Sequence, residues 1–133
     1  MGHSDWIDMH LTNALEGPLA IQNAQLVHGK FYADDDKDDE IGAEQVEDIV
    51  IPESGSGDVY SCGRQGAPVG TQGSFDLVDQ DNSQKICTIN WSSPYSGSGY
   101  LSASEVNRNY TVSIPAVRGN GPVGFVDISV AEL

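Results

Sequence analysis

The sequence predicts an all-β chain that folds as a single-domain antiparallel β-sandwich. Its 133 residues suit one domain that has its own core. Fifteen Gly and six Pro mark frequent turns. Between the turns, apolar residues alternate with polar ones, which is typical of half-buried strands. We count about nine such segments, no convincing helix and no internal repeat, which together favour a sandwich.

The first two predicted strands lie within residues 4–14 and 19–27. In the first, the side chains expected to face inward are Ile7, Met9 and Leu11, and those expected to face outward are Trp6, Asp8 and His10. The second strand is expected to bury Leu19, Ile21, Ala24 and Leu26. Because the apolar phase changes between Ile21 and Ala24, we expect a β-bulge there.

The segment from Val27 to Ile41 is the most unusual in composition. Six of the seven residues 34–40 are acidic, and Lys37 is the exception. Neighbouring carboxylates repel one another, so they need solvent, a cation or fixed donors. We expect a solvated acidic loop. The alternative is a calcium loop, because Asp34, Asp36 and Asp38 alternate as calcium ligands do, although Gly and Glu are missing from its sixth and twelfth positions.

The rest of the chain alternates between short strands and turns. Residues 43–51 are expected to form one helical turn and a short strand, and residues 54–57 a flexible turn. The remaining strands are predicted at 58–62, 71–79, 84–92, 100–103, 110–114 and 123–130. The turn at 79–82 makes a hairpin of the second and third of these strands. Residues 119–124 fit G-x-G-x-x-G, but no helix follows, so we expect a hairpin turn at Asn120-Gly121.

The charge of the chain excludes several partners. The net charge is −14, from six basic and twenty acidic residues. Nucleic acids need clustered Lys and Arg, and anionic membranes attract basic segments, so neither is expected as a partner. No apolar run reaches the ~20 residues that span a bilayer. No apolar segment follows Met1, so we expect no classical signal peptide, and a cytoplasmic or non-classically secreted protein that acts at membrane surfaces.

The sequence predicts no enzyme, cofactor or metal site. It lacks the nucleophile motif G-x-S-x-G, and its three His do not form H-E-x-x-H. Cys62 and Cys87 lack zinc-site spacing. They would form one disulfide in an oxidising compartment and two buried thiols otherwise, and the missing signal peptide favours the thiols.

Several fragments of the chain resemble one family. They are Gly29-Lys30-Phe31 with Asp36-Lys37-Asp38, Glu40 and Ile41; Ser61-Cys62-Gly63-Arg64; Gly70 to Leu77; Trp91-Ser92-Ser93-Pro94-Tyr95; and Gly124 to Ile128. In this order and spacing they resemble the aegerolysins, small β-proteins of fungi and bacteria. The matches extend from Trp6 to Val130.

The resemblance implies a fold and a function. The fold would be the actinoporin-like β-sandwich of aegerolysins. The function would be binding to sphingolipid-containing membranes, either sphingomyelin with sterol or ceramide phosphoethanolamine. A larger perforin-like (MACPF) protein would form the pore, and this chain would direct that protein to the membrane. Two alternatives stay open: a calcium- or carbohydrate-binding sandwich, and a protein-interaction module that has lost membrane binding.

The candidate lipid-binding residues are Trp6, His28, Lys30, Arg64, Val69, Trp91 and Tyr95. Aromatic rings favour the membrane interface, and a Lys or Arg can bind a lipid phosphate. The chain departs from the family at several of these positions. His28 and Tyr95 stand where many members have Trp, and Val69 where some have an acid. Alternatively, Trp91 lies in the core and Lys30 pairs with the acidic segment.

Overall fold

The computed structural model describes residues 2–117 and 121–133 and consists mainly of strands. A 3-10 helix, η1, spans Gly2–Ser4, and one short helix, α1, spans Ala43–Glu47. The strands are β1 Trp6–Ala14, β2 Leu19–His28, β3 Lys30–Ala33, β4 Asp36–Ile41, β5 Val50–Ile51, β6 Ser56–Cys62, β7 Thr71–Asp79, β8 Gln84–Ser93, β9 Tyr100–Ser104, β10 Tyr110–Ser113 and β11 Gly124–Glu132. Neither helix is long and apolar enough to cross a membrane.

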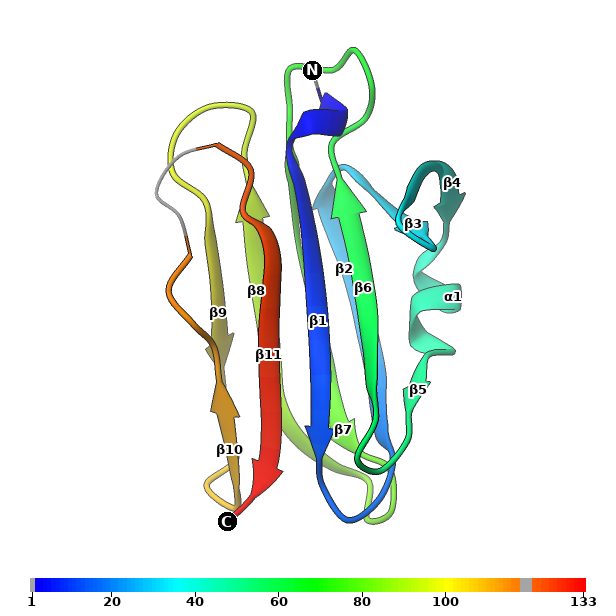
Figure 1. Cartoon of the computed structure of the whole chain (residues 1–133), viewed down its shortest axis with the longest axis vertical. Helices are drawn as coiled ribbons and strands as arrows, with labels where there is room; N and C mark the ends of the chain where they lie inside the picture. The colour runs from blue at the N-terminus through cyan, green and yellow to red at the C-terminus, as the bar shows by residue number, and fades with distance from the viewer. Residues whose placement is uncertain (1, 118–120) are drawn as a thin grey trace.

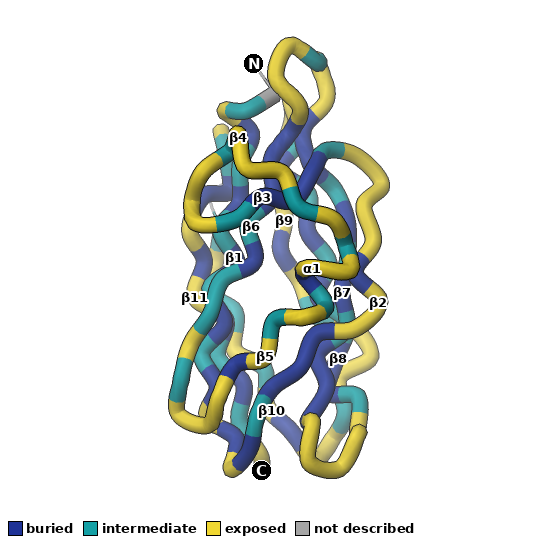
Figure 2. The backbone as a smooth tube through the Cα atoms, turned by 90° about the vertical axis from the view of Figure 1, so that its right-hand side faces the viewer, coloured by how far each residue is buried: buried dark blue, intermediate teal, exposed yellow. Residues whose placement is uncertain are grey.

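The strands form two sheets, as the predicted sandwich requires (Figure 1). The first sheet has the order β10-β11-β1-β6-β3-β4, and the second has the order β5-β2-β7-β8-β9. Buried segments line the inside of the sandwich, whereas much of the β3–β4 hairpin and of the end loops is exposed (Figure 2). The all-β sandwich predicted from the sequence is confirmed.

The alternation in the sequence correctly predicts the core. Ile7, Met9 and Leu11 are fully buried, whereas the other face of β1 is half-buried. The largest buried side chain is Trp91. Its ring lies 5.9 Å from that of Phe31 in the first sheet and 5.8 Å from that of Phe75 in the second sheet. Aromatic pairs at this separation and tilt stabilise a fold beyond the area that they bury.

One strand pair differs from the predicted antiparallel arrangement. β1 and β11 pair in parallel, from Ile7 beside Gly124 to Ala14 beside Ala131. The alternation of side chains shows which face of a strand is buried but carries no information on its direction. Because most of the chain lies between these two strands, no hairpin fixes their relative direction either.

The predicted β-bulge in β2 is confirmed, but the inward position of Leu26 is wrong. The register with β7 shifts between Gln22 and Gln25, and Asn23 has φ +53°. Beyond the bulge Ala24 is buried, whereas Leu26 is 36% exposed. A second register shift follows between Leu26 and His28, so the end of the strand no longer follows the core alternation.

The acidic segment forms a hairpin rather than the expected loop. Strands β3 and β4 pair from Phe31 beside Ile41, and Asp34 and Asp35 make the turn with φ +55° and +57°. Such turns favour Asn-Gly, and Asp also tolerates positive φ. Phe31 anchors the hairpin in the core, while most acidic side chains of β4 face solvent. The carboxylates are therefore solvated, as expected, but on a strand.

Both cysteines are buried free thiols. Burial raises the pKa of Cys87 to about 12 and also raises that of Cys62. The sequence left open a disulfide or two buried thiols, and the structure contains the two thiols. The predicted turn at Asn120 lies outside the described residues.

The packing of Trp91 predicts a large loss of stability on truncation. Trp91→Ala should lower the free energy of unfolding by about 3–5 kcal/mol, because it empties the contact between the two sheets. Chemical denaturation followed by circular dichroism measures this change. Tyr95→Ala is the control, since Tyr95 is 43% exposed and should change stability little. Equal effects of the two substitutions would contradict the assigned core.

Candidate functional site

Three of the predicted lipid-binding residues, His28, Val69 and Tyr95, line one pocket. We call it the end pocket, and its volume is about 210 Å³. It lies where β2 and β8 end and β7 begins, between the 63–70 and 94–99 loops, at the end of the sandwich that carries the N-terminus (Figure 1). The lining residues are His28, Pro68, Val69, Gly70, Thr71, Gln72, Ser92, Pro94, Tyr95 and Ser96.

Close backbone contacts hold the loops of the end pocket together. A methyl group on Gly70 would overlap the Ser93 carbonyl and Pro94, so only Gly allows this approach of the two loops. The Ser93 hydroxyl accepts a hydrogen bond from the Val123 N–H at 3.2 Å and donates one to the Trp6 carbonyl at 3.3 Å. These two hydrogen bonds connect the 94–99 side of the pocket to β1 and to the residue that precedes β11.

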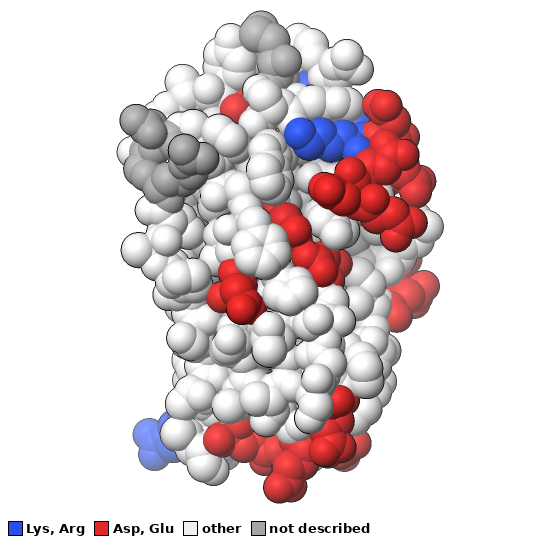
Figure 3. Space-filling model, viewed as in Figure 1, with Lys and Arg blue, Asp and Glu red and all other residues white. Residues whose placement is uncertain are grey.

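The lining of the end pocket contains no Asp, Glu, Lys or Arg. Val69 and Tyr95 expose 41% and 43% of their surface, and Val27 beside His28 exposes 63%. On the face shown in Figure 3, acidic side chains gather on the β3–β4 hairpin, in the middle of the face, and at the end opposite the N-terminus. The end pocket is therefore a locally uncharged surface on a chain of net charge −14.

Trp91 supports the end pocket from below and is not itself exposed. It is 0% exposed, which supports the alternative that Trp91 lies in the core. Its indole N–H donates to the Thr71 hydroxyl at 3.1 Å. Thr71 Oγ1 lies 2.5 Å from Ser61 Oγ, which in turn donates to the Lys30 carbonyl at 2.8 Å.

The two predicted phosphate-binding cations lie outside the end pocket. Lys30 is buried, and within the described residues it makes no ion pair, so its expected pairing with the acidic segment is wrong. Arg64 makes that pair instead, with its two terminal guanidinium nitrogens each 2.9 Å from one carboxylate oxygen of Glu40. The hydrogen bond from Arg64 lowers the pKa of Glu40. Both side chains are exposed, so the pair adds little stability and leaves Arg64 accessible.

Trp6 is half-buried, as its outward position predicted. Its ring lies on the outer face of the first sheet, with the Lys37 ammonium 5.5 Å from the ring centroid. Its backbone adjoins the end pocket through Ser93. The ring itself is not part of the lining of the end pocket and contacts Lys37 and the start of β11 instead.

Within the described part of the chain, the three Asp of the calcium alternative do not come together as a ligand set. Asp34 lies in the hairpin turn, while Asp36 and Asp38 lie on β4. The Asp36 carboxylate accepts the Asp38 N–H at 3.0 Å. Among the described residues, no group of three or more His, Cys, Asp or Glu side chains is placed to hold a metal ion.

The sequence analysis missed a titratable cluster on the outer face of the first sheet. In the register of β1 and β6, Asp8 faces Tyr60 and His10 faces Asp58. His10 Nδ1 lies 3.0 Å from Asp58 Oδ1. Burial, together with a hydrogen bond and charge from Asp58, raises the pKa of Asp8 to about 8. The alternation of β1 indicated that Asp8 and His10 share its outer face. Their neighbours on β6 depend on the strand register, which the sequence does not show.

With this geometry in place, comparison with known proteins decides the family. A family model described as Aegerolysin matches residues 4–133. The chain belongs to the aegerolysin family. The matched range covers both sheets and the end pocket, so the resemblance predicted from sequence fragments is confirmed.

Individual relatives of this aegerolysin agree. Asp-hemolysin of Aspergillus fumigatus is 40% identical over 133 residues, which cover 98% of the chain and 94% of that protein. The crystal structure of RahU protein in complex with a TRIS molecule is 29% identical, with a TM-score of 0.91 over 98% of the chain and 97% of RahU. The crystal structure of the lipid binding protein Nakanori has a TM-score of 0.60 over 94% of the chain and 70% of Nakanori, at 13% identity, and shares the fold. Together the matches support an aegerolysin-like membrane lipid-binding protein.

The raised pKa of Asp8 predicts a pH dependence of stability. An unfolded Asp titrates near 3.9, so the folded chain holds an extra proton between about pH 4 and 8. The stability from this group is complete below about pH 4 and is lost as the pH rises through about 8. Asp8→Asn mimics the protonated form, so at about pH 9 the variant should melt ~3–6 °C above the unsubstituted protein. Below about pH 4, where Asp8 is protonated in both the folded and the unfolded chain, the two should melt together.

Differential scanning calorimetry across this pH range measures the difference. Asp39→Asn, on the exposed side of the hairpin, is the control for loss of one negative charge. A stabilisation by Asp8→Asn that is the same at every pH, or one that Asp39→Asn reproduces, would contradict the assignment.

Proposed function

We propose that this aegerolysin is a non-enzymatic protein that binds sphingolipid-containing membranes through the end pocket. The observation that carries the proposal is the uncharged, partly apolar character of this pocket in a strongly acidic chain. Sphingomyelin with sterol and ceramide phosphoethanolamine are the proposed target lipids.

The distribution of charge determines which end of the protein can approach a membrane. Phospholipid surfaces are zwitterionic or anionic, and an anionic surface repels an acidic protein within roughly one Debye length of about 8 Å. The end pocket and its two loops carry no acidic residue between Ser61 and Phe75 or between Asn82 and Ser104. Through these two loops the protein presents no carboxylate of the loops to the lipid, and Glu40 of the hairpin, which reaches the 63–70 loop, is paired with Arg64.

The lining of the end pocket also fits the polar region of a sphingolipid. This region carries an amide and a hydroxyl group, which both donate and accept hydrogen bonds. Thr71, Gln72, Ser92 and Ser96 supply hydroxyl and amide partners in the pocket. Val69 and the Tyr95 ring supply exposed apolar surface of the kind that enters the membrane interface.

The proposed function extends to a perforin-like (MACPF) partner that forms the pore. Support comes from the family resemblance, in which the aegerolysin is the targeting half of such a pair, and from the name of the relative Asp-hemolysin. Flotation of liposomes that carry the aegerolysin, with and without a candidate partner, tests recruitment directly.

Substitution of Tyr95 tests the membrane contact. Tyr95→Ala should weaken binding to sphingomyelin–cholesterol liposomes by about tenfold or more, because an aromatic ring at the interface contributes roughly 1–3 kcal/mol. Co-sedimentation with liposomes of graded lipid concentration measures the affinity. Phe125→Ala is the matched control, since Phe125 is an aromatic residue that is 59% exposed and lies outside the end pocket. Unchanged binding by Tyr95→Ala would remove the end pocket from the proposal.

Lipid charge provides an independent test. Replacing part of the neutral phospholipid with phosphatidylserine should leave binding unchanged or weaken it, and lowering the salt should strengthen the repulsion. The same co-sedimentation assay measures this effect at two salt concentrations. Binding that rises with phosphatidylserine at low salt would show that a local basic surface, rather than the end pocket, controls attachment.

A further inference from the structure

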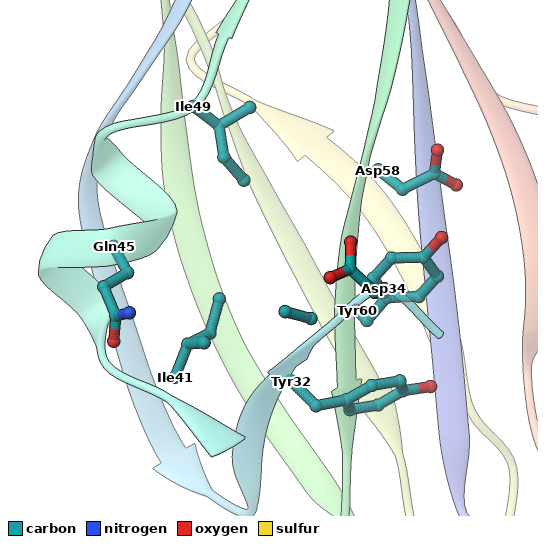
Figure 4. Close-up of a pocket in the computed structure, with 8 residues that line it drawn as sticks. Tyr32, Asp34, Ile41, Gln45, Ile49, Asp58 and Tyr60 are labelled. Atoms are coloured by element: carbon teal, nitrogen blue, oxygen red, sulfur yellow. The ribbon is translucent and has the colours of Figure 1, made fainter. Parts of the chain in front are cut away.

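A second pocket lies on the side of the sandwich and shares no lining residue with the end pocket. We call it the side pocket. It has a volume of about 440 Å³ and is bounded by α1, the β3–β4 hairpin and β6 (Figure 4). Its lining residues are Tyr32, Ala33, Asp34, Ile41, Gln45, Ile49, Asp58 and Tyr60. This volume is within the range of small-molecule sites.

Two tyrosines form one wall of the side pocket. The Tyr32 and Tyr60 rings stack with centroids 5.3 Å apart and planes inclined by 27°. Tyr32 is 1% exposed, yet its hydroxyl has no hydrogen-bond partner among the described residues. In Figure 4 the hydroxyls of Tyr32 and Tyr60 point away from Ile41 and Ile49, so the tyrosines offer their rings, rather than their hydroxyls, to a molecule between these two walls. Burial raises the pKa of Tyr60 to about 12, which keeps the phenol neutral at physiological pH.

The side pocket is negatively charged and holds no Lys or Arg among its lining residues. Asp34 makes no ion pair among the described residues, and Asp58 pairs only with His10. The nearby cations of the hairpin region are engaged elsewhere, with Arg64 on Glu40 and Lys37 over the Trp6 ring. A ligand that enters this pocket therefore meets the Asp34 carboxylate, which has no ion pair among the described residues, beside aromatic rings.

We propose that the side pocket binds a small organic ammonium ion, either a quaternary or a primary amine. Tyrosine rings attract such ions, and a carboxylate supplies the opposite charge. Ile41 and Ile49 on the opposite wall provide apolar contact for methyl or methylene groups. A metal ion is the poorer fit, because no described group of carboxylates and imidazoles is placed to coordinate one. A neutral sugar would leave the negative charge uncompensated.

Calorimetric titration with choline, in a buffer free of amines, tests the proposal. The neutral isostere 3,3-dimethylbutan-1-ol has the same shape without the charge. Choline should bind, and the isostere should bind at least tenfold more weakly. Tyr60→Leu should weaken choline binding at least tenfold. Absence of choline binding, or equal affinities for choline and the isostere, would overturn the proposal.

A second variant separates recognition from folding. Asp34→Asn preserves the hairpin turn, because Asn tolerates the positive φ of this position at least as well as Asp. It should weaken choline binding about fivefold or more. Asp38→Asn removes the same charge from the same hairpin outside the pocket and should change the affinity less than twofold. Equal effects of the two would mean that overall charge, and not the pocket, attracts the ligand, which overturns the proposal.

The ammonium ion can come from a free amine or from a lipid headgroup, and liposomes distinguish the two sources. For a headgroup, Tyr60→Leu and millimolar choline should both reduce binding to sphingomyelin–cholesterol liposomes. For a free amine, neither should. The proposal is independent of the end pocket, since Tyr95→Ala should leave choline binding unchanged. The experiments can therefore contradict ammonium binding by the side pocket without contradicting lipid binding by the end pocket, and the reverse.

Discussion

The packing of Trp91 is the contact on which both sheets and the end pocket depend. The ring fills the space between Phe31 and Phe75, which belong to opposite sheets. A methyl group on Gly73 would overlap this indole, so a Gly in β7 is what allows the ring to come this close to the strand. The single polar atom of the indole is satisfied by Thr71, which is itself part of the end pocket. One buried side chain therefore joins the core to the surface that we propose meets the membrane.

The acidic residues of the chain are concentrated in certain regions and absent from others. The hairpin takes six acidic residues in seven positions, and they tolerate one another because most face solvent from an edge strand. Such an edge also resists pairing with other chains, since exposed charge is one of the ways in which edge strands avoid aggregation. The loops of the end pocket stay free of acids. Charge thus protects one edge of the sandwich and leaves one end able to approach lipid.

The sequence predicted local features well and spatial neighbours poorly. Strict alternation over β1 correctly assigned Ile7, Met9 and Leu11 to the core, because the period of a strand is set by its backbone. The same alternation could not say that β1 pairs in parallel with β11, nor that Asp8 faces Tyr60. The acidic segment was expected to be a loop because its composition opposes a strand, and the anchoring of Phe31 in the core outweighs that propensity.

The same distinction applies to the site. Family resemblance supplied His28, Val69 and Tyr95, which three separate segments bring to one pocket. It also supplied Trp91. A match to a family motif does not show whether a side chain is buried, and Trp91 is buried in the core. Lys30 and Arg64 were hard to separate in the sequence, because each is one of only six basic residues in an acidic chain. The backbone decides between them: Lys30 lies in a strand of the sheet, whereas Arg64 lies on a loop within reach of Glu40.

Strand β3 connects the two pockets through the alternation of its side chains. Phe31 points into the core against Trp91, which supports the end pocket, while the next residue, Tyr32, lines the side pocket against Tyr60. A slip of one residue would exchange these faces, so the register of this short strand must be fixed for either pocket to form. The pairing of Phe31 with Ser61 fixes it on one side, and the positive-φ turn at Asp34 and Asp35 fixes it on the other. The turn that carries Asp34 of the side pocket is thus also the turn that holds Phe31 under the end pocket.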